Sequence, residues 1–378
     1  MADLPFLDLS PDPAEAGREH GRVMTSAIGA NLDIYLARFA YGGADRKTVL
    51  EEAERWADFI ATDNADYFTE MQGVAEGAGR SVTEIAMLNA RYELTYSIYA
   101  REAAVLSGTG PEQEGCTLWG LMPAMTANGT CMIGQNWDWL AGLVGNVFIK
   151  RVRRGEDRDA GKPDVLGFTE AGIVGCKIGV NSAGIGLCLS GLTTETEGGA
   201  VLRKPVHVRC AEVLEAWRFS EALRPVVQTD RVCSANFMIG HGEGEIIDIE
   251  ATQKHCAYIY PEDGIVTHSN HLIAETRVAS TIERIATSTL FRAQRVQRGL
   301  KRAAGNIDLD TIHDVMSDHF SAPTGVCQHP DTARAAEARN TTVSSLAIDM
   351  KNGVLWATDG PPCQAPFQRF DLFDQSEG

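Results

Sequence analysis

Hydrophobic residues recur at helical spacing through the front part of the chain. This periodicity predicts helices over residues 14–40, 46–60, 67–78 and 82–99. The run Ser81-Val82-Thr83-Glu84 at the start of the last helix has the pattern of a capping box, in which the serine and glutamate side chains bond to backbone N–H groups. His20 lies inside the first helix and is interpreted as structural. The front of the chain is therefore predicted to be a helical layer.

After a glycine-rich, polar segment at residues 103–115 the pattern changes to short β-rich runs bounded by glycine. The predicted strands cover residues 116–123, 130–138, 147–152, 165–169, 177–180, 185–189, 234–239, 245–250, 255–260, 264–268, 341–350 and 354–357. Helices are predicted at residues 206–217, 220–227, 274–301 and 309–319. This order lacks the regular strand–helix alternation of a parallel sheet. It predicts an α+β fold in which two antiparallel sheets stack face to face and helices cover them.

The first two strands carry the candidate chemistry. If residues 116–123 and 130–138 form a hairpin around the turn at Ala127–Thr130, the outer ends of the two strands lie side by side. Cys116 and Asp138 are then neighbours. The thiol of Cys116, the Gly115–Cys116 peptide bond and the carboxylate of Asp138 are therefore predicted to lie close together.

Composition and charge exclude several classes of function. The chain has 378 residues and a formal charge of -17, which disfavours binding to nucleic acids and to anionic membrane surfaces. Its nine cysteines are scattered without a CxxC pair, which favours buried thiols in a reducing, cytoplasmic compartment. No signal peptide or apolar run long enough for a membrane span is visible. No metal or cofactor is expected.

Several runs of residues resemble the isopenicillin N acyltransferase family, and the resemblance extends over nearly the whole chain. The motifs that carry it are Gly115-Cys116-Thr117, Gly134-Gln135-Asn136-Trp137-Asp138, Thr169-Glu170-Ala171-Gly172, Asn181-Ser182-Ala183-Gly184, His268-Ser269-Asn270-His271 and Arg292-Ala293-Gln294-Arg295. The helical front contributes Gln72–Ala78 and Glu84–Arg91. The glycine–cysteine pair combined with the GQNWD run is the most specific part.

The resemblance implies an N-terminal nucleophile hydrolase with a four-layer αββα sandwich. Members of that family are precursors that cut themselves before the nucleophile. This chain is therefore expected to be cleaved between Gly115 and Cys116. The products would be a helical α chain of residues 1–115, retained in the fold, and a β chain of residues 116–378 that carries the catalytic core.

The resemblance also assigns roles to individual residues. Cys116 is the expected nucleophile, Asp138 orients its amine, and Asn270 is the expected oxyanion donor. The catalytic arginine of the family matches Arg339, and Arg292 is the second candidate. The fungal enzyme has serine before this arginine, where this chain has Ala338, so hydroxyl assistance to processing at this position is in doubt.

The chemistry of a cysteine at the start of a chain supports the same assignment. A free α-amino group titrates near pH ~8, so the amine of a newly exposed Cys116 can act as the base for its own thiol. Before cleavage the thiol can attack the carbonyl carbon of Gly115 instead. Glycine suits that approach because it has no Cβ to clash.

Three functions remain open. If water attacks an acyl-Cys116 thioester, the protein is a hydrolase of small N-acyl amides, and this function is favoured. If an amine attacks the thioester, the protein is an acyltransferase, which can use acyl-coenzyme A as its acyl donor. The third possibility is a non-catalytic binding protein on the same fold.

His268 and His271 lack partners at metal-like spacing in the sequence, so they are not expected to bind a metal. The expected partners are a small amide substrate and, after cleavage, the α and β chains for each other. A homo-oligomer is left open.

Overall fold

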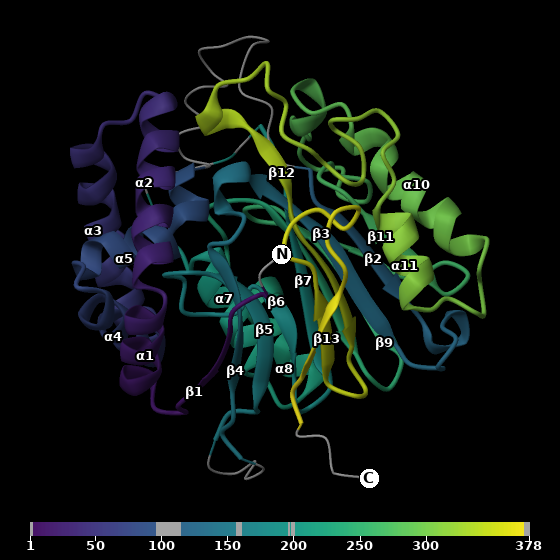
Figure 1. Cartoon of the computed structure of the whole chain (residues 1–378), viewed down its shortest axis with the longest axis horizontal. Coiled ribbons are helices and arrows are strands. Elements are labelled where there is room, and N and C mark those ends of the chain that lie inside the picture. Colours follow the sequence, from purple (N-terminus) through teal and green to yellow (C-terminus); the bar gives the residue numbers. More distant parts are fainter. Residues whose placement is uncertain (1–2, 96–114, 156–160, 196, 198–200, 374–378) are drawn as a thin grey trace.

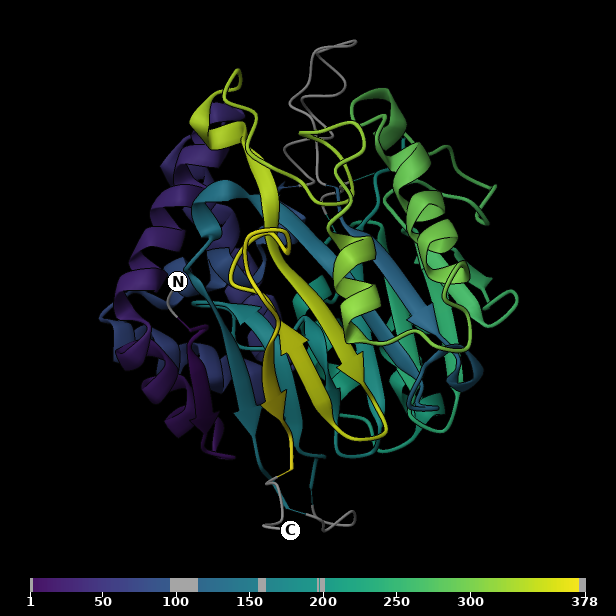
Figure 2. The same ribbon diagram turned by 45° about the vertical axis from the view of Figure 1, so that its right-hand side comes forward.

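Two β-sheets form the centre of the molecule (Figures 1 and 2). The computed structural model describes residues 3–95, 115–155, 161–195, 197 and 201–373. The eight-stranded sheet has the order β1 (Phe6–Leu9), β4 (Val147–Val152), β5 (Val165–Glu170), β6 (Ile178–Asn181), β7 (Ile185–Gly191), β8 (Ala235–His241), β9 (Glu245–Ala251) and β10 (Cys256–Ile259). The six-stranded sheet has the order β11 (Ile265–His268), β2 (Thr117–Leu121), β3 (Met132–Leu140), β12 (Asn340–Asp349), β13 (Val354–Ala357) and β14 (Gln368–Asp371). Among the described neighbours, only β1 and β4 pair in parallel.

Helices cover the outer face of each sheet, so the predicted αββα order is confirmed (Figure 1). The layer on the eight-stranded sheet contains α1 (Pro13–Val23), α2 (Thr25–Tyr41), α3 (Arg46–Asp63), α4 (Ala65–Ala78), α5 (Val82–Asn89), α7 (Val206–Leu214), α8 (Phe219–Ala222) and α9 (Arg224–Val227). The layer on the six-stranded sheet contains α10 (Thr289–Lys301) and α11 (Leu309–Met316). None of the described helices is both long enough and apolar enough to cross a membrane.

The two sheets are held together by a continuous core and by one buried amide. Gln135 of β3 donates to the carbonyl oxygen of Leu189 at 2.9 Å and accepts from the N–H of the same residue at 2.8 Å. Beside it, the rings of Trp137 and Phe168 meet edge to face with centroids 5.4 Å apart. The polar groups of the amide are satisfied across the interface, so it can be buried without a desolvation penalty.

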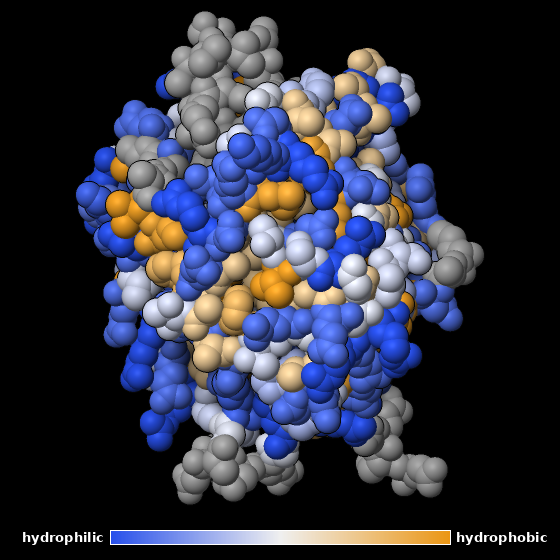
Figure 3. Space-filling model, turned by 90° about the vertical axis from the view of Figure 1, so that its left-hand side faces the viewer, coloured by the Kyte–Doolittle hydropathy of each residue, from blue (hydrophilic) through white to orange (hydrophobic). Residues whose placement is uncertain are grey.

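The N-terminal helices belong to the same hydrophobic core as the strands that follow them. One cluster of buried side chains includes Ile28 and Leu88 from the helices together with Cys116 and Phe168. The outer face of these helices is largely hydrophilic, with smaller hydrophobic areas (Figure 3). Such a two-faced layer buries its apolar stripe against the sheet and leaves its polar side in water.

Several local predictions hold and some need correction. The capping box of Ser81 and Glu84 is present. The predicted helix at 14–40 is two helices that meet at Met24, and the short strands β1 and β14 were missed. The predicted helix at 274–301 begins only at Thr289. The end of the predicted helix at 82–99 and residues 103–114 lie outside the described residues.

The late start of this helix has a tertiary cause. The carboxylate of Glu250 accepts hydrogen bonds from the backbone N–H groups of Ile273, Ala274 and Glu275. Because the side chain of Glu250, on strand β9, binds these three N–H groups, residues 273–275 are held in an irregular conformation and not in a helix. Sequence periodicity does not report such a contact.

Helices α1 and α4 cross at a distance that only glycine allows. A Cβ added at Gly73 would lie 2.5 Å from the carbonyl oxygen of Ala14 and 2.9 Å from the backbone nitrogen of Arg18. Helix α1 is also tied to the eight-stranded sheet, because the buried ring of His20 accepts a hydrogen bond from the N–H of Gly172 at 3.0 Å. Gly172 lies just after β5.

We predict that Gly73→Ala lowers the free energy of unfolding by about 1–3 kcal/mol, because backbone atoms of two helices must separate. Gly29→Ala is the matched control, since its new Cβ would meet only the flexible end of Arg80. Alanine has the higher helix propensity, so this control should gain up to about 1 kcal/mol. Denaturant titration measures both. Equal shifts in the two variants would contradict the close crossing.

Candidate active site

Cys116 lies directly before β2, which pairs with the edge strand β11 on one side and with β3 on the other. Its side chain is 1% exposed, and its Sγ atom lies 3.7 Å from the carbonyl oxygen of Asp138. Strands β2 and β3 pair with Thr117 opposite Asn136. The predicted hairpin, with Cys116 beside Asp138, is therefore confirmed.

The carboxylate of Asp138 is fully buried and held by the next strand. Its Oδ1 atom accepts a hydrogen bond from Thr342 Oγ1 at 2.5 Å. Thr342 lies on β12, where the pairing with β3 shifts register between Thr342 and Ser344. A hydroxyl donor makes it less costly to bury a carboxylate and fixes its orientation.

Arg292 lies on α10 and reaches the predicted cleavage site. Its Nη1 donates to the carbonyl oxygen of Gly115, to that of Cys116 at 2.5 Å and to Thr117 Oγ1 at 2.8 Å. Burial lowers the pKa of this guanidinium to about 10, and the negative charges of Asp138 and Cys116 oppose that shift. The group remains a cation at neutral pH, so a buried positive charge faces the carbonyl oxygen of Gly115.

Asn270 supports Arg292 from the end of β11. Its Oδ1 accepts from Arg292 Nη2 at 2.7 Å, and its Nδ2 donates to the carbonyl oxygen of Gly191 at 2.9 Å. Its backbone N–H donates to Thr289 Oγ1 at 2.9 Å. The side-chain amide is thus used within the protein. In this geometry Asn270 positions the arginine.

Gln328 is a site residue that sequence reasoning missed. Its Nε2 donates to the carbonyl oxygen of Gly115 at 3.3 Å, and its backbone N–H donates to Thr342 Oγ1 at 2.9 Å. A Cβ on Gly115 would lie 1.6 Å from that Nε2 atom. Any larger residue at 115 would displace the amide. No motif marks Gln328, because it lies in an irregular loop before β12.

Arg339 lies outside this group. Its Nε donates to the carbonyl oxygen of Arg334 at 3.0 Å and its Nη2 to that of Thr332 at 3.3 Å. The geometry thus favours Arg292, which contacts the predicted cleavage site, over Arg339, which lies in the neighbouring loop. Ala338, which precedes it, ends a short 3₁₀ helix.

A buried ionic cluster lies on the inner side of Cys116. Glu170 accepts from Arg91 at 2.5 Å and from Lys177 at 2.6 Å, and Lys177 Nζ lies 3.1 Å from the centroid of the Trp137 ring. Burial lowers the pKa of Lys177 to about 7, while Glu170 and, more weakly, Cys116 favour its charged form. Burial alone would raise the pKa of Glu170, but the positive charges of Arg91 and Lys177 outweigh the effect of burial and lower the pKa of Glu170 to about 2. Arg292 and Lys177 are thus both close enough to Cys116 to interact with it electrostatically.

The histidines beside Asn270 are structural. His268 Nε2 lies 2.9 Å from Glu250 Oε1, and His271 Nδ1 lies 3.0 Å from Thr289 Oγ1. Each ring is bound to a neighbouring side chain of a different element, which accounts for its position without a metal.

Two hollows lined by described residues can be compared with the position of the site. The hollow beside Gln328 and Ser288 has a volume of about 20 Å³, which is room for a water molecule. A hollow of about 400 Å³ lies elsewhere, between α1, α4 and β4, and none of the site residues lines it. In this form of the chain the carbonyl of Gly115 occupies the place where Arg292 and Gln328 converge.

Comparison with known proteins places the chain in a family. The model of the family described as acyl-coenzyme A:6-aminopenicillanic acid acyl-transferase matches residues 124–362. This match includes Asp138, Asn270 and Arg292 and begins after Cys116. The 40 kDa form of acyl-coenzyme A:6-aminopenicillanic-acid-acyltransferase from Emericella nidulans is 30% identical over 345 residues, which is 89% of this chain and 87% of that protein.

Among solved structures, a variant of conjugated bile acid hydrolase from Clostridium perfringens is 14% identical with a TM-score of 0.47, over 68% of this chain and 93% of that one. Penicillin V acylase from Agrobacterium tumefaciens is 13% identical with a TM-score of 0.46, over 68% and 86%. From the family match and the relative at 30% identity, the chain belongs to the acyl-coenzyme A:6-aminopenicillanic acid acyl-transferase family.

Proposed function

We propose that this protein is a self-cleaving cysteine enzyme that cuts or forms the amide bond of a small N-acyl compound through an acyl-Cys116 thioester. One observation carries the proposal. The carbonyl oxygen of Gly115, next to the buried thiol of Cys116, accepts hydrogen bonds from both Arg292 and Gln328. Two fixed donors on a carbonyl that a neighbouring thiol can attack are the parts of an oxyanion hole.

The self-cleavage step follows from this arrangement. Sγ of Cys116 attacks the carbonyl carbon of Gly115, and the negative charge that develops on the oxygen is stabilised by Arg292 and Gln328. The C–N bond then breaks, and the nitrogen of Cys116 takes up a proton and becomes a free amine. Water hydrolyses the resulting thioester, which leaves a carboxylate on Gly115 and restores the thiol.

The same groups then serve the external substrate. The carboxylate of Asp138 is oriented by Thr342 and attracts the new ammonium group of Cys116, whose neutral form accepts the thiol proton. Once the carbonyl of Gly115 has left, Arg292 and Gln328 are available to the carbonyl oxygen of a bound N-acyl compound. Attack by Cys116 gives the acyl thioester and releases the amine product.

What attacks that thioester decides the reaction class. We propose hydrolysis by water as the main reaction, because a chain with a charge of -17 does not attract a polyanion such as coenzyme A. The acyl-coenzyme A-dependent transferase is the second candidate, and the relative from Emericella nidulans with that name favours it. Both share one covalent intermediate.

The shared core supports retention of the N-terminal segment after cleavage. Buried residues on both sides of Cys116 belong to one hydrophobic cluster, and Arg91 binds Glu170 across the proposed cut. Separation of the two chains would expose this apolar surface and leave a buried carboxylate with one cation fewer.

Purified wild-type protein should give two polypeptides in denaturing mass spectrometry, with the larger one beginning at Cys116. Their masses should sum to that of the full chain plus one water. Cys116→Ala should remain a single chain because it has no nucleophile. Cys188→Ala, which removes another buried thiol, is the control and should mature normally. Full activity of an uncut wild-type protein would contradict the proposal.

The two arginines give a matched test of the oxyanion site. We expect Arg292→Lys to slow self-cleavage on the order of 10²–10³-fold, because lysine cannot reproduce the forked donors. Arg339→Lys should cleave within a few-fold of wild type. The time course of precursor loss after refolding measures both rates. A large loss in Arg339→Lys with none in Arg292→Lys would restore Arg339 as the catalytic arginine.

Incubation of the mature enzyme with N-acyl amides, followed by an acid quench, should leave the mass of the acyl group on Cys116. Adding an amine tests the fate of this thioester. Free acid released at an unchanged rate identifies a hydrolase, whereas partition into a new amide identifies a transferase. A parallel experiment with acyl-coenzyme A tests the second donor. A cleaved enzyme that forms no adduct with any of these compounds would leave the binding protein as the better account.

A further inference from the structure

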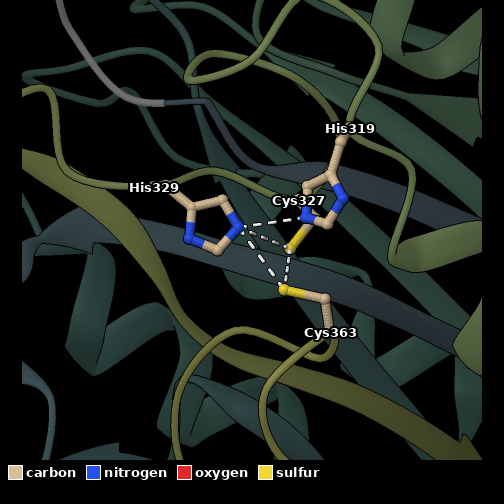
Figure 4. A group of neighbouring side chains, drawn as sticks. All are labelled: His319, Cys327, His329 and Cys363. Carbon is tan, nitrogen blue, oxygen red and sulfur yellow. Dashed lines mark hydrogen bonds between the residues drawn. The ribbon is translucent and has the colours of Figure 1, made fainter.

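Four side chains with metal-binding atoms converge on one another (Figure 4). They are His319, Cys327, His329 and Cys363, and their ligand atoms all lie within 4.8 Å of one another. Cys327 is buried, His329 is half-buried, and the other two are exposed. The four residues come from two loops that are far apart in sequence.

Four of the six distances between these atoms are close to the edges of a tetrahedron. The two sulfur atoms are 3.6 Å apart, and the Nε2 atoms of His319 and His329 are 3.0 Å apart. His329 Nε2 lies 3.7 Å from the sulfur of Cys327 and 3.4 Å from that of Cys363. Around a zinc ion with Zn–S of about 2.3 Å and Zn–N of about 2.0–2.1 Å, the corresponding edges are roughly 3.8, 3.3 and 3.5 Å. Zinc binding would lengthen three of these distances and shorten the fourth, each by about 0.1–0.3 Å.

Hydrogen bonding does not account for this convergence. A ring nitrogen of neutral histidine makes a single hydrogen bond, as donor or as acceptor. His329 Nε2 faces the Nε2 of His319 and both sulfur atoms at once. A cation among the four atoms explains why one nitrogen has three such neighbours.

We propose that His319, Cys327, His329 and Cys363 bind one zinc ion in a closed structural site. Two thiolates and two imidazoles are a ligand set that zinc prefers, and four protein ligands leave no open position for a substrate or an activated water. The exposed side chains of His319 and Cys363 give the ion access from solvent.

The site would join segments that have little regular structure of their own. His319 lies after α11, Cys327 and His329 lie before β12, and Cys363 lies between β13 and β14. The ion would tie the loop before β12 to the loop after β13. Gln328 stands between two of the ligands, so the ion would also hold the donor that reaches the carbonyl of Gly115. This last consequence rests on the proposed function, whereas the metal site does not.

The proposed site departs from the expectation that the chain holds no metal. The expectation of buried thiols holds for Cys327, whereas Cys363 is exposed. The ligands are too irregularly spaced for a sequence motif. Only the Cys327–His329 pair is close in sequence, and Cys363 joins it through the pairing of β12 with β13.

Metal analysis of the purified full-length protein tests the proposal. Wild-type protein should contain about one zinc per chain, and added Co²⁺ should give the visible bands of a tetrahedral cobalt–thiolate centre. Cys363→Ser should bind Zn²⁺ at least about 100-fold more weakly in competition with a chromophoric chelator, since even outer-shell changes cost 10–100-fold. Cys256→Ser, a half-buried thiol outside the cluster, is the matched control and should bind as wild type does.

The wild-type measurements decide the question even if a variant fails to fold. Wild-type protein that carries no zinc and takes up neither Zn²⁺ nor Co²⁺ would overturn the proposal. A Cys327–Cys363 disulfide in freshly purified protein, seen as the loss of two hydrogens, would overturn it as well. Equal metal binding by Cys363→Ser and wild type would place the ion elsewhere and reject this site. Self-cleavage is not part of this readout, so failure of the proposed function is distinguished from failure of the site.

Discussion

The need to satisfy one buried cation organises the centre of this protein. Arg292 is fully buried, and a guanidinium removed from water is costly unless its N–H groups find acceptors. The acceptors are the carbonyl oxygens of Gly115 and Cys116, the hydroxyl of Thr117 and the amide oxygen of Asn270. Helix α10, the start of β2 and the end of β11 must therefore meet at one point. That point is the peptide bond before the thiol.

Electrostatics on the two sides of Cys116 complement each other. Arg292 approaches from the layer of α10, and Lys177 belongs to an ionic cluster with Glu170 on the inner side of the sheet. A buried thiolate near positive charge is less costly than one in an apolar core. The pairing of β2 with β3, which helps to close the core, also fixes Cys116, the proposed nucleophile, near these two groups.

Local patterns predicted the strand pairing but not the contacts made over long distances. The hairpin that joins Cys116 to Asp138 follows from the alternation and turn residues of a short stretch, so the sequence sufficed. The choice between Arg292 and Arg339 depends on which element packs against the start of β2, and sequence order does not encode that. Gln328 carries no motif at all. The four side chains of the proposed metal site were not predicted for the same reason, because only the folded loops bring them together.

In the proposed mechanism, Arg292 and a second donor, Gln328, hold the carbonyl of Gly115 before cleavage. A crystal structure of the uncut Cys116→Ala precursor would test this arrangement. We predict that the Gly115 carbonyl oxygen lies within hydrogen-bonding distance of the guanidinium of Arg292 and the amide of Gln328. A Gly115 carbonyl directed away from both donors, with Arg292 bound to other acceptors, would contradict it.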